Sequence, residues 1–163
     1  MASAGITQKT RDTTAQTPTA IISPHGRTGD PSMPAKALGI FSGEVWLDLI
    51  LRSDEATIGL VNFLPGGRTA WHRHEKGQIL KVTGGAGWLC DQGQKPRRIA
   101  AGDVVYCPPG VVHWHGADDG TYMVHEATSF GQTDWYEEVS DKEYAAKESK
   151  SQMKNGGVPG EGQ

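Results

Sequence analysis

Five of the six histidines in this chain lie between His72 and His125, and their spacing is that of a metal site. Four of them form two His-x-His pairs, His72 with His74 and His113 with His115. Side chains alternate between the two faces of a β-strand, so both imidazoles of such a pair point to the same side. Imidazole nitrogens are common ligands of transition metals. The pattern therefore predicts a transition-metal pocket in a β-rich region.

The segments around these histidines have the pattern of short strands. Two apolar runs, 44–51 and 56–63, are separated by the turn-prone residues 52–55. Further strand-like segments follow at 78–82, 87–90, 104–106, 113–116 and 122–128. Gly, Pro and Asp separate the segments, at 65–67, 84–85, 91–93, 101–103 and 108–110. Many short strands with closely spaced turns indicate an all-β sandwich or barrel.

The two ends of the chain have a different composition. The first residues are rich in Thr, Ser, Ala, Gln, Gly and Pro without apolar periodicity, which is typical of a flexible arm. Near the other end, Ser140 and Glu143 have the spacing of a capping box and predict a short helix over about 141–148. We therefore divide the chain into an N-terminal arm at 1–35, a barrel with its helix at 36–148 and a disordered tail at 149–163.

Composition excludes several classes of function. The net charge of -3 offers no basic surface for nucleic acid. No apolar run approaches the roughly 18 residues that a membrane span needs, and the N-terminal segment lacks the apolar stretch of a secretory signal. A transit peptide is disfavoured because Arg11 and Arg27 are the only arginines there. Cys90 and Cys107 are expected to stay reduced, which favours a cytoplasmic protein.

Two motifs frame the histidines, and their glycines and proline fit the tight corners of a small double-sheet barrel. They read Gly66-x5-His72-x-His74-x3-Gln78-x6-Gly85 and Gly102-x5-Pro108-x-Gly110-x2-His113. In this order and spacing they resemble the two signature motifs of the cupin superfamily, over roughly residues 60 to 128. The resemblance implies a double-stranded β-helix, or jelly-roll barrel.

Strand parity places His72, His74 and Gln78 on one face, and His113 would join them from another part of the barrel. In cupins these positions hold one divalent transition metal, with Mn most favoured here and Fe, Zn, Co or Ni as alternatives. Many cupins have Glu where this chain has Gln78, so a bound ion would keep its full charge as a Lewis acid. Ala117, where the usual motif has Asn, is expected to matter for structure alone.

Segments such as 65–74, 102–105, 113–117 and 134–135 are similar to small single-domain cupins that include manganese-dependent hydroxynitrile lyases. This similarity implies a redox-neutral lyase acting on a small organic molecule. His125 would be the general base, and His115 would contact the substrate. The alternatives are an Fe-dependent dioxygenase, an isomerase, decarboxylase or dehydratase, and a non-catalytic ligand-binding cupin. Cupins of this size commonly pair, so we expect a homodimer or a larger homo-oligomer.

The other side chains with chemical potential have plainer interpretations. Trp71, Trp88 and Trp114 are expected to pack, the first and last of them on the sheet face opposite the histidines. Arg68 is expected to be a solvated charge at the rim, with steering of an anionic substrate as the alternative. Tyr106 could line the pocket or not, and His25 lies in the arm without an expected role.

Overall fold

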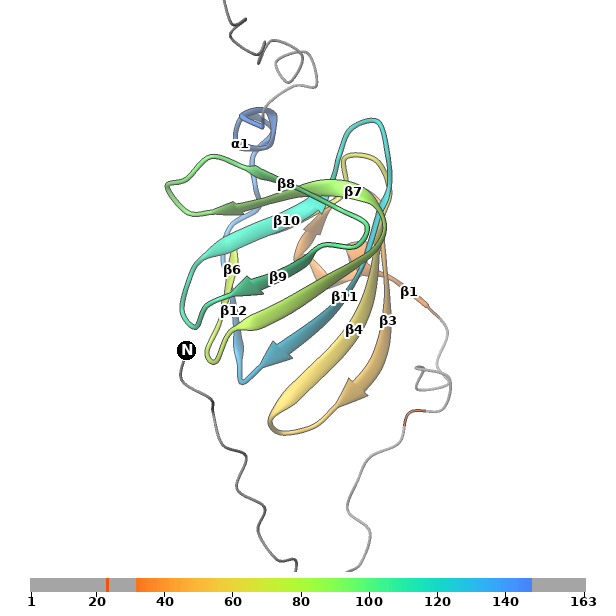
Figure 1. Cartoon of the computed structure of the whole chain (residues 1–163), viewed down its shortest axis with the longest axis vertical. Helices are drawn as coiled ribbons and strands as arrows, with labels where there is room; N and C mark the ends of the chain where they lie inside the picture. Colours follow the sequence, from red (N-terminus) through yellow and green to blue (C-terminus); the bar gives the residue numbers. More distant parts are fainter. Residues whose placement is uncertain (1–22, 24–31, 148–163) are drawn as a thin grey trace, which may run out of the picture.

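The computed structural model describes residue 23 and residues 32–147, and in this part twelve strands form one curled antiparallel sheet (Figure 1). The strands are β1 (Met33–Pro34), β2 (Phe41–Ser42), β3 (Val45–Arg52), β4 (Ala56–Phe63), β5 (Arg68–Thr69), β6 (His72–His74), β7 (Gln78–Asp91), β8 (Arg97–Ala100), β9 (Val104–Cys107), β10 (His113–Ala117), β11 (Met123–Phe130) and β12 (Thr133–Trp135). A 3-10 helix, η2 (Ala35–Leu38), follows β1, and one α-helix, α1 (Asp141–Ala145), lies near the end of this part.

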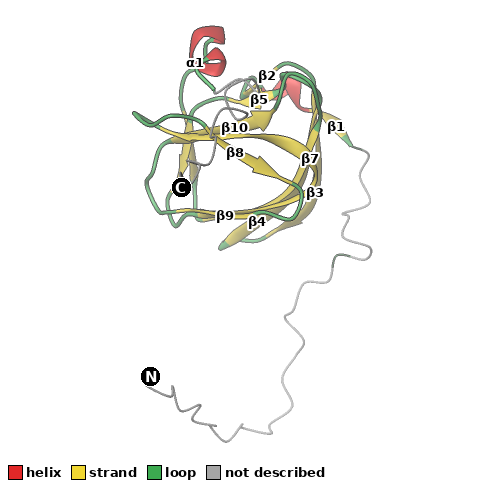
Figure 2. Ribbon diagram, turned by 45° about the horizontal axis from the view of Figure 1, so that its top comes forward, coloured by secondary structure: helices red, strands yellow, loops and turns green. Residues whose placement is uncertain are grey.

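The sheet curls into two facing layers, with α1 outside them (Figure 2). One layer has the strand order β1, β3, β4, β11 and β7, with β9 also paired to β7. The other layer joins β10 to β5, β6 and β7, and it extends through β2, β8 and β12. This arrangement confirms the all-β, double-layered barrel with a short C-terminal helix.

Strand β7 belongs to both layers because it bends without ending. The sequence predicted two strands here, separated by a turn at Gly84 and Gly85, and that prediction was wrong. Gly85 has a φ of 67°, and the register with β11 shifts between Val124 and His125. A Cβ at Gly85 would lie 1.8 Å from the carbonyl oxygen of Tyr122. The glycine therefore permits a bulge that turns the strand from one layer into the other.

The other sequence-predicted strands are confirmed within one or two residues at each end. The sequence missed β8 and the short strands at the layer edges, whose few residues carry no alternating apolar pattern. Helix α1 begins as predicted, with Ser140 and Glu143 forming a capping box, and ends at Ala145. The predicted tail lies outside the described residues. So does the predicted arm, apart from residues 23 and 32–35, of which Met33 and Pro34 form β1.

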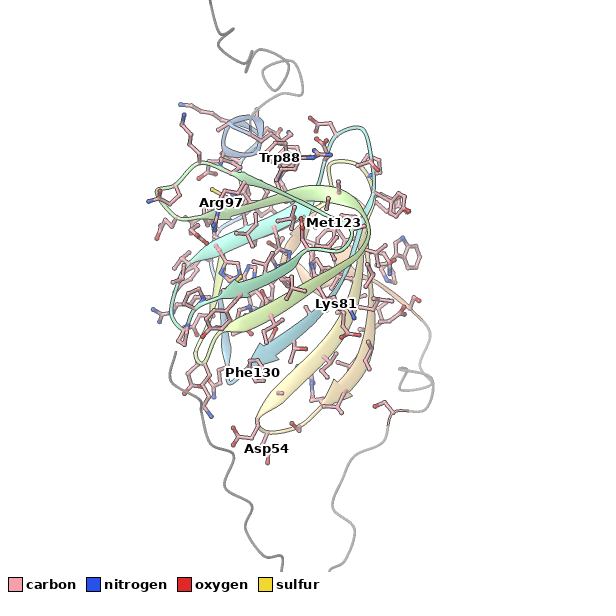
Figure 3. The ribbon with its side chains drawn as sticks, in the orientation of Figure 1. Asp54, Lys81, Trp88, Arg97, Met123 and Phe130 are labelled. Carbon is pink, nitrogen blue, oxygen red and sulfur yellow. The ribbon has the colours of Figure 1, made fainter. Side chains whose placement is uncertain are left out.

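Two apolar clusters lie on opposite sides of the β10 layer. The larger fills the barrel and includes Phe63, Leu80, Leu89 and Met123. The smaller joins the three predicted packing residues Trp71, Trp88 and Trp114 to Cys90, Val139 and Tyr144. In Figure 3 Trp88 lies at the end of the barrel near α1. Strand β10 therefore presents histidines to the interior and Trp114 to the outer cluster.

None of the helices in the described part of the chain has the length and apolar character required to cross a membrane.

Candidate metal centre

Three buried histidines converge inside one end of the barrel. His72 and His74 lie on the same face of β6, and His113 on β10 is the direct register partner of His72. Their ligand nitrogens all lie within 4.8 Å of one another, and each side chain is at most 2% exposed. Such spacing allows all three to bind a single ion.

Each imidazole ring in this three-histidine centre is held by a hydrogen bond at its Nδ1 atom. His72 Nδ1 lies 3.0 Å from the carbonyl oxygen of Ala70, and His113 Nδ1 lies 3.0 Å from that of Val111. A carbonyl can only accept, so both Nδ1 atoms carry the proton and both Nε2 atoms present lone pairs. His74 Nδ1 lies 2.9 Å from Thr133 Oγ1, and its buried Nε2 has no hydrogen-bond partner among the described residues. Outer hydrogen bonds of this kind orient metal-binding imidazoles.

The side-chain oxygen of Gln78 lies beside the three-histidine centre. Gln78 Nε2 donates to Ser129 Oγ at 3.0 Å, and Gln78 Oε1 lies 3.2 Å from His113 Nε2. Since Nδ1 of neutral His113 carries the ring proton, that contact brings two lone pairs together. A cation between them would turn this unfavourable contact into two favourable ones. The donors therefore fit a transition metal held by three nitrogens and one amide oxygen.

Burial keeps the three imidazoles neutral. It lowers the pKa of His74 to about 4, with the neighbouring His113 contributing. Burial also holds the pKa of His72 well below its usual value, again with a contribution from His113, and it lowers the pKa of His113. Neutral imidazole is the form that binds metal, so these side chains need not lose a proton at neutral pH before an ion binds.

His115 and His125 form a second histidine group in the same cavity. His115 on β10 contacts the centre, with its ring centroid 5.2 Å from that of His72. His125 lies on β11, and its Nε2 is 3.1 Å from His115 Nδ1. The other nitrogens of this His115–His125 pair, His115 Nε2 and His125 Nδ1, are buried and have no hydrogen-bond partner in the part of the chain that the structure describes. Burial lowers the pKa of both rings, that of His125 to about 4, which is below the near-neutral pKa that suits a general base.

A cavity of about 390 Å³ joins both groups. Its wall is largely apolar, through Leu38, Ile40, Phe41, Leu47, Val61 and Trp135, and its polar side chains besides the histidines are Arg52, Thr57, Thr69, Gln78, Ser129 and Thr133. This volume is within the range of small-molecule sites. The cavity can therefore hold a small organic molecule against the three-histidine centre.

The structure thus brings together all six residues that the sequence selected, and their roles as ligands and base stay predictions.

Arg68 differs from the expectation of a solvated rim charge. Its guanidinium donates to the carbonyl of Val139 and to Asp141, and the side chain is 11% exposed. It fastens the C-terminal segment to β5 and does not line the cavity. Tyr106 is 62% exposed on β9 and does not line it either.

Sequence reasoning missed Arg52, Thr133 and Ser129. Thr133 and Ser129 hold His74 and Gln78, but their types and spacing carry no recognisable motif. Arg52 was assigned to a turn, whereas it is the last residue of β3 and lines the cavity. Extending the predicted strand by one residue would have included Arg52, but strict alternation would then have pointed it away from the cavity.

The barrel, with three histidines and a glutamine brought together inside it, agrees with the resemblance to cupins, and comparison with known proteins supports the same family. The family model described as Cupin domain matches residues 59–125. The chain is also 40% identical over 111 residues to (R)-mandelonitrile lyase of Granulicella tundricola, covering 64% of this chain and 85% of that protein. The chain therefore belongs to the cupin family.

Among solved structures, a cupin-like protein from Thermotoga maritima is 39% identical, with a TM-score of 0.66 over 69% of this chain and 91% of that one. A cupin 2 conserved barrel domain protein from Rhodopseudomonas palustris is 21% identical, with a TM-score of 0.56 over 72% of this chain and 82% of that chain. The second likeness shows the fold alone.

Proposed function

We propose that this protein is a metal-dependent lyase of the hydroxynitrile type, which cleaves small cyanohydrins to an aldehyde and HCN. One observation carries the proposal: two buried, neutral imidazoles with free nitrogens lie directly beside a three-histidine centre. The identity of 40% to (R)-mandelonitrile lyase supports the same reaction class.

The His115–His125 pair can supply a base and a donor at once. With the shared proton on His125 Nε2, that nitrogen donates to His115 Nδ1. His125 Nδ1 is then a free lone pair, and the proton of His115 lies on its Nε2. The hydroxyl proton of a cyanohydrin passes to His125 Nδ1 while the C–CN bond breaks and its electron pair leaves on cyanide. The oxygen forms the aldehyde C=O, and the proton returns from His125 to cyanide as HCN.

His72, His74, His113 and Gln78 would hold the metal ion. A bound divalent ion supplies Lewis-acid chemistry, because it lowers the pKa of a hydroxyl group that lies against it. All four donors are neutral, so the protein leaves the positive charge of the ion uncompensated. Manganese as the native ion, a homo-oligomer and a cytoplasmic location belong to this proposal.

The test begins with metal content per chain, on protein purified without chelator or metal-affinity steps. Mandelonitrile cleavage and oxygen uptake are then measured side by side on the metal-free, manganese-loaded and iron-loaded protein. We expect about one ion per chain and benzaldehyde release that needs the ion, without oxygen uptake. Oxygen consumption with iron and no cleavage would favour the dioxygenase. Failure to take up metal after reconstitution would favour the non-catalytic ligand-binding cupin.

A further inference from the structure

We infer that the cavity takes a ligand bearing a carboxylate, held at the mouth by Arg52 while the opposite end of the ligand faces the three-histidine centre. The inference names a substrate class for the proposed function and rests on it for which end of the ligand reacts. Its evidence is a bulge in β3, a row of polar side chains across one layer, and the charge of the cavity wall.

A β-bulge turns Arg52 toward the interior. Leu47 pairs with Val61 and Leu49 with Gly59, and of these Leu47, Val61 and Gly59 line the cavity. The register then shifts between Leu49 and Leu51. Without this shift, strict alternation from Leu49 would point Arg52 outward. With it, Arg52 lies opposite Thr57, and both residues line the cavity. Re-aiming a side chain is a known use of bulges beside functional sites.

Arg52 ends a row of polar side chains that begins at the metal centre. In register across β3, β4, β11 and β7 the row runs Arg52, Thr57, Ser129 and Gln78. Ser129 Oγ accepts from Gln78 Nε2, so its own hydroxyl proton remains to be donated to a ligand. Three strand spacings of about 4.8 Å separate the backbones of Arg52 and Gln78 by about 14 Å. A ligand between them can contact the guanidinium and the centre together.

The residues behind this row leave room for the ligand. The next row into the barrel contains the register partners Gly59 and Ala127, of which Gly59 is covered by the side chain of Leu47 and Ala127 presents only a methyl group to the cavity. The row after it contains Val61 and His125. A molecule lying over Ala127 would therefore have the row of Arg52 on one side and the row of His125 on the other.

Within the described part of the chain, the cavity wall carries positive charge without a compensating carboxylate. Among its described lining residues Arg52 has the one formal charge, and none is Asp or Glu. Glu55, in the turn after Arg52, is paired with Lys76 at 2.9 Å. Figure 3 shows Asp54 at the tip of the β3–β4 hairpin, outside the wall. Arg52 is exposed at the mouth, where it can meet a ligand from solvent.

A carboxylate fits this arrangement better than a phosphate does. A guanidinium presents paired N–H donors that match the two oxygens of a carboxylate, and the single charges balance. A phosphate dianion would bring a second charge, and the described cavity wall offers no second cationic side chain to meet it.

The test compares two ligands of nearly equal shape, 4-(hydroxymethyl)benzoate and 4-(hydroxymethyl)benzamide, by calorimetric titration of the full chain. Benzoate and acetate complete the series. We expect the wild type to bind the hydroxymethylbenzoate about tenfold more tightly than the amide, in both the metal-loaded and the metal-free protein. Arg52→Gln should reduce this ratio to about one. Arg52→Lys should keep part of it, because lysine retains the positive charge but lacks the paired N–H donors of a guanidinium.

Arg97→Gln is the control, because it removes the same charge from β8, away from the hairpin tip that bears Asp54 (Figure 3). It should keep the full preference. Equal affinities in the wild type, an unchanged ratio in Arg52→Gln, or no binding of any of the carboxylates would overturn the inference. A preference that metal removal abolishes would show that the ion binds the carboxylate, which also overturns it. Titration involves no turnover, so a failure of cyanohydrin cleavage would sink the proposed function and leave this result standing.

Discussion

The three histidines of the metal centre and the two of the His115–His125 pair are all buried, and both groups reach the same cavity, but the rings are held in different ways. Each ring of the centre is fixed through Nδ1 by a hydrogen-bond partner outside the group: Ala70, Val111 or Thr133. The rings of the pair are fixed by each other, through His125 Nε2 and His115 Nδ1. The difference decides which nitrogens are free and what they can do.

An imidazole that is held by a hydrogen bond at Nδ1 keeps the lone pair of its Nε2 in a fixed position, which suits coordination of an ion. A pair that shares a proton keeps one free acceptor and one free donor, which suits proton transfer. Strand β10 carries a member of each group, His113 and His115, two residues apart. The local sequence therefore cannot separate the two roles, whereas the hydrogen bonds around the rings can.

The largest effect is expected from His74→Ala. It removes one of three nitrogens, and metal content should fall from about one ion per chain to below about a tenth, with activity lost. Circular dichroism should stay unchanged, because the barrel core lies elsewhere. His115→Ala is the matched control and should retain the metal. Normal metal content in His74→Ala would remove His74 from the site and dissolve the distinction between the groups.

His125→Ala tests the role of the His115–His125 pair in proton transfer. We expect the metal to stay bound and the rate of cyanohydrin cleavage to fall by about 10²-fold, the lower end of the usual contribution of a general base, because the lowered pKa makes His125 a weak base. Elemental analysis and the rate of benzaldehyde release measure the two quantities on the same sample. An active His125→Ala protein would take this residue out of the mechanism, and loss of metal would make it part of the centre.

Thr133→Val removes the hydrogen-bond partner of His74 Nδ1 and leaves the His74 imidazole itself in place. The valine has nearly the same shape but offers no partner to His74 Nδ1. Metal affinity should weaken by about tenfold, as is usual when an outer hydrogen bond to a ligand is lost. Competition with a fluorescent chelator measures it. Thr128→Val, on the outer face of β11, is the control. Equal affinities in the two variants would show that the outer hydrogen bond does not matter.

Strand alternation is a local property, and it predicted an all-β barrel, while the motif spacing resembled that of cupins and selected the six residues that the structure brings together. His72, His74 and Gln78 share a face by parity alone. The sequence could not predict Arg52 at the cavity, because a bulge in β3 changes the parity in a run of apolar residues that gives no sign of it. Nor could it predict that β7 continues through Gly84 and Gly85, since glycines permit a turn and a bend equally.

The smallest effect is expected on the outer face of β10, where Tyr144→Phe tests whether the centre is independent of the packing behind it. The Tyr144 hydroxyl donates to the carbonyl of Ala117 at 2.8 Å, at the end of the strand that carries His113 and His115. Loss of this buried hydrogen bond should cost about 1 kcal/mol of unfolding free energy, which lowers Tm by about 2–4 °C in a chain of this size. Metal content should not change, because the backbone bonds of β10 to β7 hold the histidines in place. Calorimetry and elemental analysis measure the two effects. A parallel loss of metal would mean that the outer apolar cluster, and not the sheet, sets the position of His113.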